Sequence, residues 1–555
     1  MRRTKVVLIG IACSIFFIFI FLRQLIFSID KPLNDPDIFY QYFLLEGNLK
    51  HFTTLDFGNL YETRMFYPMK NTLALGNSQF VQSLMALPAF LVTRNVIVSA
   101  HVMIFINFFL SFFTMYLLVY RLTRSVGGSL VAGLIFSYNP FVMAQFYFEL
   151  LTIFWIPLIF LITESIITKP TFLKGMILPI LFLFQLISSF YYIFIIAITW
   201  PVYVALRYRH KATKLLTPGF IFGLIMAGTI GYFYLRPYLE MKEKFRVTRN
   251  LERVDLHSAT WIDFFAASPY NKIYGSQSIE GKIIKSLRGT ALVDYYSEHF
   301  TEHSLFPGVA AYILFFISIF LLTRVAFRQQ FVEAIPLFVI LVVAVLISFG
   351  PSLPVYTFMY TYIPFVDSLR APSRFAVVGL FALALMAGFA ATKANKWILI
   401  LIIIFITLEY QHRFFPISVR PDIREAYSWL NNQDRITVIS ELPMANNLLN
   451  YPNVFRSYFD DSTYLLFALY HDKKLINGNA AYNPPERTEL GQALTINFPT
   501  PSKLEQLKDM GVDALVVHRN GYKDTRIADE VIEKLQKSDL RQIYTSESIL
   551  IFTYE

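Results

Sequence analysis

Long apolar runs separated by short polar turns make up most of the chain. Each run is close to the roughly 20 residues that a helix needs to cross a bilayer. Runs such as Ile335 to Ile347 are continuously apolar rather than alternating, which favours helices over barrel strands. The runs lie at about Lys5 to Ser28, Phe80 to Val92, Val96 to Tyr120, Leu130 to Phe146, Leu150 to Ile167, Met176 to Ser188, Tyr192 to Leu206, Leu216 to Leu235, Gly308 to Leu322, Val332 to Phe349, Phe375 to Ala391 and Trp397 to Glu409.

Basic residues in the short turns predict which side of the membrane each loop faces. Lys and Arg favour the cytoplasmic side, and they cluster at the N-terminus and in the turns that contain Arg121, Lys169, Arg207, Arg324 and Lys393. The N-terminus is therefore expected in the cytoplasm, and the large loops 29–79 and 236–306 outside it. Only one crossing fits between the first helix and Arg121, so the short, Pro-containing run Phe80 to Val92 is expected to dip into the membrane or lie on its outer face. We predict about eleven transmembrane helices within residues 1–415.

Composition agrees with this pattern. The chain is 55% hydrophobic and only 16% charged, and its mean hydropathy is +0.48. These values exclude an ordinary soluble protein. The net charge of +10 reflects basic turns between apolar runs, so we expect the lipid bilayer rather than a nucleic acid as the partner. The expected location is the plasma membrane, with many crossings.

The last part of the chain, residues 420–555, has a different pattern. Short apolar segments such as Ile436 to Ile439 and Ala514 to Val517 alternate with amphipathic ones such as Ile527 to Gln536. Alternating strands and helices of this kind predict a soluble α/β domain large enough to have its own core. It is expected on the extracytoplasmic side.

Two carboxylates, Asp35 and Asp37, follow the first helix in the stretch from Asn34 to Tyr42. Asp35 is a good helix N-cap, and Pro36 suits the first helical position. Both carboxylates are then explained as the start of a short helix on the membrane surface, with Ile38, Phe39, Tyr42 and Phe43 as its apolar face. The functional alternative is that one of them, preferably Asp37, is a general base acting on an acceptor hydroxyl. A single base is enough when the leaving group is a phosphate that departs without protonation.

Other ionisable side chains concentrate in the predicted external loops. Arg64, Lys70, Arg370 and Arg374 offer positive charge for a phosphate, although the last two also suit anchoring at the membrane interface. Glu298-His299 and Glu302-His303 repeat at a spacing of four. Three interpretations of this repeat stay open: a divalent metal site, contact with substrate, and a solvated structural loop. No cofactor is certain, and a divalent metal is the only candidate.

Several short motifs, in their order along the chain, resemble bacterial membrane proteins of the GT-C glycosyltransferase superfamily, especially its YfhO-like members. The motifs are the acidic pair Asp35 and Asp37, Phe66-Tyr67-Pro68, Asn139-Pro140, Trp155-Ile156-Pro157-Leu158, Gln185 with Ser189-Phe190-Tyr191-Tyr192, Glu302 to Gly308 and Leu369 to Phe375. The resemblance covers most of residues 1–415. It implies a GT-C fold, a lipid-phosphate-linked sugar donor and a catalytic base at Asp37, with Asp35 as the alternative. In the turn after Asn139-Pro140, where relatives often have a histidine, this chain has Gln145, Tyr147 and Glu149.

The leading hypothesis is an inverting glycosyltransferase that moves a sugar from a polyprenyl phosphate to an extracytoplasmic glycan, lipid or protein. Asp37 would be the base, Arg370 or Arg374 would neutralise the phosphate, and Glu149, Glu302 and His303 would contact substrate. The alternative is a non-enzymatic lipid-glycan transporter or cell-envelope assembly scaffold. The scarcity of charge within the apolar runs weakens transport as an explanation.

Overall fold

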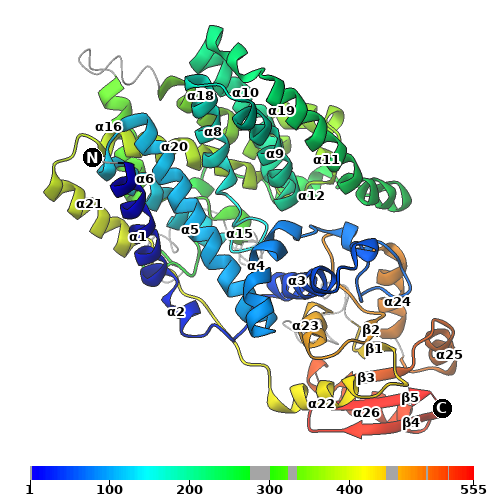
Figure 1. The fold of residues 1–555 in the computed structure, drawn as a ribbon. Coiled ribbons are helices and arrows are strands. Elements are labelled where there is room, and N and C mark those ends of the chain that lie inside the picture. Colours follow the sequence, from blue (N-terminus) through cyan, green and yellow to red (C-terminus); the bar gives the residue numbers. More distant parts are fainter. Residues whose placement is uncertain are drawn as a thin grey trace. The chain divides into compact units, whose positions relative to one another are not determined.

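The computed structural model describes residues 3–275, 300–322, 334–444, 461–495, 498–522 and 524–554. The chain forms two compact units, each built from several separate stretches of sequence (Figure 1). The first unit contains Met1–Ser28, His101–Leu235 and Thr248–Phe414, and the second contains Ile29–Ala100, Arg236–Val247 and Phe415–Glu555. The boundary after Phe414 lies next to the predicted one, but the grouping of 29–100 with the C-terminal part was not expected from the sequence.

The first unit is almost entirely helical. Its helices are α1 (Arg3–Phe21), α2 (Arg23–Ile26), α5 (Val96–Thr123), α6 (Val126–Tyr138), α7 (Pro140–Ala144), α8 (Trp155–Thr168), α9 (Phe172–Ser188), α10 (Phe190–Tyr208), α11 (Pro218–Phe245), α12 (Leu251–Leu256), α15 (Phe300–His303), α16 (Val309–Leu322), α18 (Ile335–Ser348), α19 (Pro354–Tyr362), α20 (Ala376–Ala391) and α21 (Lys396–Glu409). The first residues of α5 and the last residues of α11 extend into the second unit.

Six helical segments in the described residues are long and apolar enough to cross a membrane: Thr4–Phe21, Val96–Thr123, Val126–Ala144, Phe190–Tyr208, Pro218–Phe245 and Pro372–Ala391. Five shorter apolar helices accompany them, and one of these is α4 (Phe80–Thr93). The prediction of a multi-pass helical membrane protein is confirmed. The count of about eleven crossings, the orientation of the termini and the place of α4 in the membrane stay predictions.

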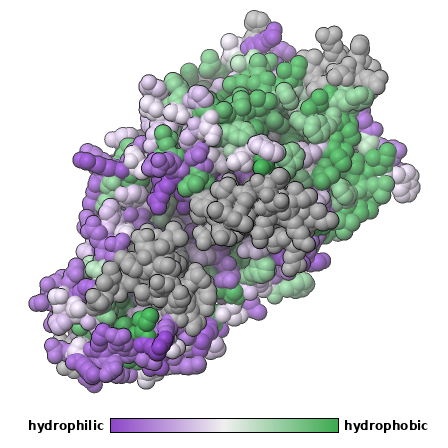
Figure 2. Space-filling model, turned by 180° about the vertical axis from the view of Figure 1, so that it is seen from behind, coloured by the Kyte–Doolittle hydropathy of each residue, from purple (hydrophilic) through white to green (hydrophobic). Residues whose placement is uncertain are grey.

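Helix α20 forms the centre of the first unit. Every one of its residues is buried, and it packs against α6, α16 and α18. Small residues allow α6 and α20 to approach closely: a Cβ on Gly128 would lie 2.5 Å from the carbonyl oxygen of Gly388. The outward faces of the other helices carry the apolar surface, and Figure 2 shows hydrophobic side chains spread over the helical part.

Several predicted boundaries were wrong in detail. The first helix does not continue to Ser28 but breaks at Leu22, between α1 and α2. The run Leu130 to Phe146 is split because Asn139 caps a new helix, accepting a bond from the backbone N–H of Val142 at 3.1 Å. Helix α11 continues beyond Leu235 to Phe245, so the polar loop begins later than residue 236.

The second unit contains a mixed five-stranded sheet of order β2-β1-β3-β5-β4. Strand β1 pairs in parallel with β2 and β3, whereas β5 is antiparallel to both β3 and β4. The elements are α3 (Pro36–Thr54), α4, α22 (Pro421–Asn431), β1 (Val438–Leu442), α23 (Asp461–Phe467), β2 (Lys474–Leu475), α24 (Pro485–Thr495), α25 (Pro501–Asp509), β3 (Ala514–His518), α26 (Thr525–Gln536), β4 (Leu540–Thr545) and β5 (Ile549–Tyr554). The predicted C-terminal α/β structure is therefore present.

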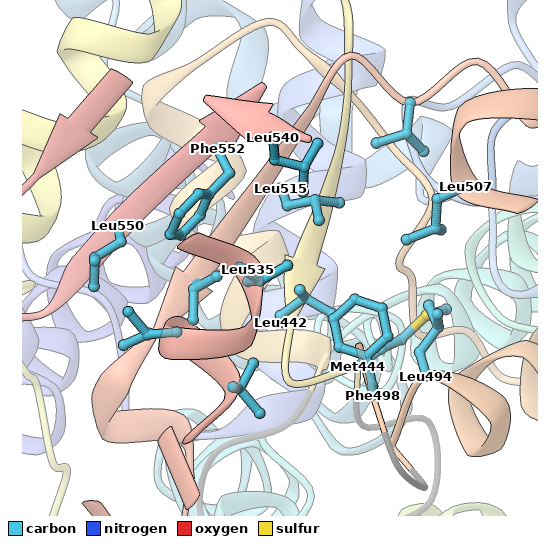
Figure 3. Close-up of a cluster of buried hydrophobic side chains, with 14 of the residues drawn as sticks. Leu442, Met444, Leu494, Phe498, Leu507, Leu515, Leu535, Leu540, Leu550 and Phe552 are labelled. Atoms are coloured by element: carbon cyan, nitrogen blue, oxygen red, sulfur yellow. The ribbon is translucent and has the colours of Figure 1, made fainter. Parts of the chain in front are cut away.

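The core of this sheet lies between its strands and the helices that cover them. Leu442, Leu515 and Phe552 point from β1, β3 and β5 towards Leu535 of α26 (Figure 3). The N-terminal part of the chain is joined to the edge of the same sheet. The backbone N–H of Leu475 in β2 donates to the carbonyl of Arg64 at 2.7 Å, and the N–H of Tyr67 donates back to Leu475 at 2.9 Å. This backbone pairing explains why the predicted loop 29–79 belongs to the second unit.

Candidate functional site

Asp35 and Asp37 stand at the start of α3 and have different roles. The carboxylate of Asp35 accepts bonds from the backbone N–H groups of Asp37 at 2.9 Å and Ile38 at 3.3 Å, with Pro36 at the first helical position. The prediction that Asp35 is an N-cap is confirmed. The side chain of Asp37 is exposed and forms no ion pair with any described residue. Within the part of the chain that the structure describes, this carboxylate is therefore exposed to solvent.

The helix that they start is longer than predicted. It runs for 19 residues rather than a few turns, and its apolar face is buried in the second unit. Ile38, Phe39, Tyr42 and Phe43, the predicted apolar face, are all buried. The helix therefore has a packed protein face and is not simply a helix on the membrane surface.

Arg64, a predicted phosphate ligand, is already engaged within the second unit. Its guanidinium forms an ion pair with Glu46 of α3, lies 3.7 Å from Asp472 and donates to the carbonyl of Ala468 at 3.1 Å. Glu46 also pairs with Lys50 at 2.6 Å. The charge of Arg64 thus holds α3 against the segment between α23 and β2. Lys70 is exposed.

The first unit contains a buried ion pair between two other predicted residues. A guanidinium nitrogen of Arg374 donates to Glu302 at 2.9 Å, and the two side chains are only 7% and 4% exposed. Arg374 lies in η9 (Pro372–Phe375), the turn that leads into α20, and Glu302 lies in the short helix α15. Pro372 begins this turn. The hydroxyl of Thr301 also donates to the carboxylate of Glu302.

Aromatic rings and a second arginine surround this pair. The guanidinium carbon of Arg374 lies 4.6 Å from the ring centre of Tyr191 and 5.8 Å from that of Tyr147. Glu149, which is also buried, is close enough to interact electrostatically with Arg374. Arg370 lies 3.8 Å from Glu302, but its side chain is 40% exposed. Arg370 therefore connects the buried pair with the solvent.

His303 does not face this pair. One ring nitrogen lies 2.8 Å from the carboxylate of Asp263 and the other lies 3.0 Å from the carbonyl oxygen of Leu256. The carboxylate of Asp263 also accepts the backbone N–H of Thr260 at 2.7 Å. His303 thus ties α15 to the segment after α12, and this fixes the position of the neighbouring Glu302.

The charges around Glu302 keep it ionised. Burial raises the pKa of this carboxyl, but the charges of Arg374 and Arg370 and the hydroxyl of Thr301 lower it more, so that the pKa of Glu302 is about 2. At neutral pH the carboxylate of Glu302 is shared between Arg374 and Arg370, and Glu149 adds a second carboxyl group near Arg374. Arg370 can attract an anion to the partly exposed edge of this site, next to the buried pair of Glu302 and Arg374.

The metal prediction concerns residues that are only partly described. Glu298 and His299 lie outside the described residues. Glu302 and His303 are directed to Arg374 and Asp263, and no group of three or more metal-binding side chains gathers in the described residues. A divalent metal at this repeat stays a prediction.

The structure brings five of the predicted residues together in the first unit: Glu149, Glu302, His303, Arg370 and Arg374. The second unit holds Asp35, Asp37, Arg64 and Lys70. Sequence reasoning missed Asp263, which gives no local signal, and the rings of Tyr147 and Tyr191 as neighbours of Arg374. Both tyrosines do belong to segments that the sequence singled out.

Comparisons with known proteins give a match in fold alone. No protein-family model and no curated protein sequence matches the chain. Arabinofuranosyltransferase AftD from Mycobacteria matches with a TM-score of 0.60 and 12% identity, covering 100% of this chain and 40% of AftD. An oligosaccharyltransferase from Archaeoglobus fulgidus matches with a TM-score of 0.44 and 11% identity, covering 100% of this chain and 74% of that one. ArnT from Cupriavidus metallidurans matches with a TM-score of 0.42 and 10% identity, covering 100% and 98%.

The fold assignment rests on AftD. This chain spans about two fifths of the length of AftD, and the likeness extends over the whole of this chain. The likeness does not distinguish a YfhO-like subgroup, which stays a prediction. With its apolar helices and its α/β part, the chain shares its fold with the matched two fifths of arabinofuranosyltransferase AftD.

Proposed function

We propose that this protein is a membrane glycosyltransferase that takes a sugar from a lipid phosphate and transfers it to an extracytoplasmic acceptor. The observation that carries the proposal is the half-exposed Arg370 beside the neutralised pair of Glu302 and Arg374, in a chain that shares its fold with part of AftD. A shared fold does not show a shared substrate, so we do not assign to this chain the arabinofuranosyl group that the name of AftD indicates.

Phosphate binding is assigned to Arg370. Arg370 shares Glu302 with Arg374 and is partly exposed, so that its guanidinium can also reach an anion, and a guanidinium suits the geometry of phosphate oxygens. Arg374 and Glu302 are then positioning residues. As the bond between sugar and phosphate breaks, the negative charge that develops on the phosphate is stabilised by Arg370.

The general base is assigned to Asp37. Its exposed carboxylate is free of described ion pairs, whereas Asp35 is occupied by its capping bonds. Asp37 would accept the proton of an acceptor hydroxyl as the oxygen attacks the anomeric carbon. The phosphate leaves as an anion and needs no proton. One displacement of this kind inverts the configuration at the anomeric carbon.

The proposal is tested with purified protein in lipid nanodiscs. A panel of polyprenyl-phosphate-linked sugars with radiolabelled sugar is incubated with an extracted cell-envelope fraction, and release of polyprenyl phosphate is measured with label transfer. Arg370→Gln should weaken donor binding by about 10- to 100-fold, because one charge-assisted contact is lost. Arg253→Gln, which removes an exposed arginine of α12, is the matched control and should bind donor as the parent does.

Two results would contradict the proposal. If no donor in the panel is consumed, while labelled lipid is moved across the bilayer of vesicles that contain the protein, a transporter replaces the transferase. Equal donor affinity in Arg370→Gln and Arg253→Gln would remove Arg370 from the phosphate site.

A further inference from the structure

Buried polar side chains without a hydrogen-bond partner gather on the segments around Arg374. Within the described residues, neither amide atom of Gln145 or Gln185 has a partner, and the same is true of the hydroxyls of Ser189, Ser373 and Tyr356. All five side chains are at least 97% buried. Polar groups buried in a protein are nearly always hydrogen-bonded to protein, ordered water or a ligand, so five such residues in one region can supply hydrogen bonds to a bound molecule.

The segments that carry these side chains meet at the guanidinium of Arg374. Gln145 precedes Tyr147 by two residues, and Gln185 and Ser189 lie just before Tyr191 at the junction of α9 and α10. Both tyrosine rings lie against Arg374, at 5.8 Å and 4.6 Å. The polar groups are therefore on segments that converge, although they come from distant parts of the sequence.

The two remaining groups lie on two further segments near Arg374. Ser373 is the residue before Arg374 in η9. Tyr356 lies in α19, with its ring 6.5 Å from that of Phe375, and it interacts electrostatically with Tyr191. We call Gln145, Gln185, Ser189, Tyr356 and Ser373 the polar shell.

The chemistry of the polar shell identifies its ligand class. Its groups are uncharged amides and hydroxyls, which both donate and accept hydrogen bonds. A sugar ring presents hydroxyls that do the same, and such a site rejects analogues that leave its buried groups unpaired. Arg374, the cation beside these groups, is already paired with Glu302, so the side chains left for a ligand are neutral, whereas a phosphate is bound by cations and a metal by carboxylates or imidazoles. The half-exposed Arg370, which shares Glu302 with Arg374, marks the solvent side of this region.

We propose that the polar shell binds the sugar ring through its hydroxyl groups, and that Gln145 and Gln185 decide which sugar is accepted. The binding of a sugar at this place does not depend on the proposed function. The statement that the bound sugar is the one transferred rests on the proposed function. Arg370 would bind the phosphate at the partly exposed edge of this region, and the two glutamines would form hydrogen bonds with the hydroxyl groups of the sugar ring.

The test measures sugar affinity and stability together, because the proposal predicts that each substitution weakens sugar binding without lowering the melting temperature. Gln145→Leu and Gln185→Leu replace an unpaired buried amide by an apolar group of similar size. Melting temperatures in detergent should stay the same or rise, since no internal hydrogen bond is lost. Saturation-transfer NMR with D-glucose, D-galactose, D-mannose and D-arabinose should show binding of at least one sugar to the parent, and about tenfold weaker binding to each variant.

Two serines give a matched control. Ser189 and Ser318 are both fully buried, and the hydroxyl of each lacks a partner within the described residues, but Ser318 lies in α16 and outside the polar shell. Ser189→Ala should weaken sugar binding, and Ser318→Ala should not. The proposal is overturned if the parent binds none of the four sugars, if the glutamine variants bind as the parent does, or if their melting temperatures fall. Sugar binding without any transfer would contradict the proposed function and leave the polar shell in place.

Discussion

Replacing Glu302 by Gln should destabilise the protein strongly, and the loss should depend on pH. The variant keeps the size of the side chain but removes the negative charge that compensates the buried guanidinium of Arg374. A shift of the pKa of Glu302 from its ordinary value of 4.5 to about 2 corresponds to about 3 kcal/mol of folding free energy. This agrees with the roughly 3 to 5 kcal/mol lost when one partner of a buried pair is removed.

The sign of the pH dependence follows from the lowered pKa. Because the pKa of Glu302 is lower in the folded state than in the unfolded state, its contribution is complete above pH of about 4.5 and is lost as the pH falls towards about 2. The parent should therefore be much more stable than Glu302→Gln at neutral pH, and the difference should narrow in acid.

Thermal unfolding in detergent, followed by tryptophan fluorescence across this pH range, measures the effect. Glu252→Gln, an exposed glutamate of α12, is the matched control and should change little at any pH. The double variant Glu302→Leu with Arg374→Met should recover much of the stability, since it removes both charges together. A Glu302→Gln variant as stable as the parent at neutral pH, or a loss that is the same in acid, would refute the reasoning.

Four further substitutions test three separate parts of the structure by the same unfolding measurement. Asp35→Ala removes the cap of α3 and should cost about 1 kcal/mol, whereas Asp37→Ala should cost less than about 0.5 kcal/mol; equal losses would contradict their division of roles. Arg64→Met should cost about 1 to 3 kcal/mol because it leaves a buried carboxylate with only its lysine partner, and no loss would show that this ion pair does not hold α3 in place. Gly350→Ala should cost at least about 1 kcal/mol, since the backbone there has φ of +60° and a Cβ would lie 2.0 Å from the hydroxyl of Ser258; a neutral result would mean that the turn adapts freely.

Local patterns predicted the elements that depend on local chemistry. The apolar runs predicted most of the helices of the first unit, and Asp35 with Pro36 predicted the start of α3. In the C-terminal part, Ala514 to Val517 and Ile527 to Gln536 match β3 and α26 closely. These signals are carried by residues a few positions apart, so a single sequence contains them.

Pairings between distant residues were not predictable in this way. Glu302 and Arg374 are 72 positions apart, and each alone is an ordinary charged residue of an external loop. The backbone of Arg64 pairs with β2, about four hundred residues further along the chain, which no hydrophobic pattern indicates. Gln145 and Gln185 drew notice only as parts of motifs, because burial without a partner is visible only in three dimensions.

The central claim is that Asp37 is the base of a sugar transfer, and the measurement that tests it most directly is the rate of transfer by Asp37→Asn. This variant should fold as the parent does, because the cap of α3 is Asp35. Donor affinity should be unchanged, while single-turnover transfer from a polyprenyl-phosphate sugar falls by at least about 100-fold. Transfer by Asp37→Asn at the rate of the parent would contradict the account.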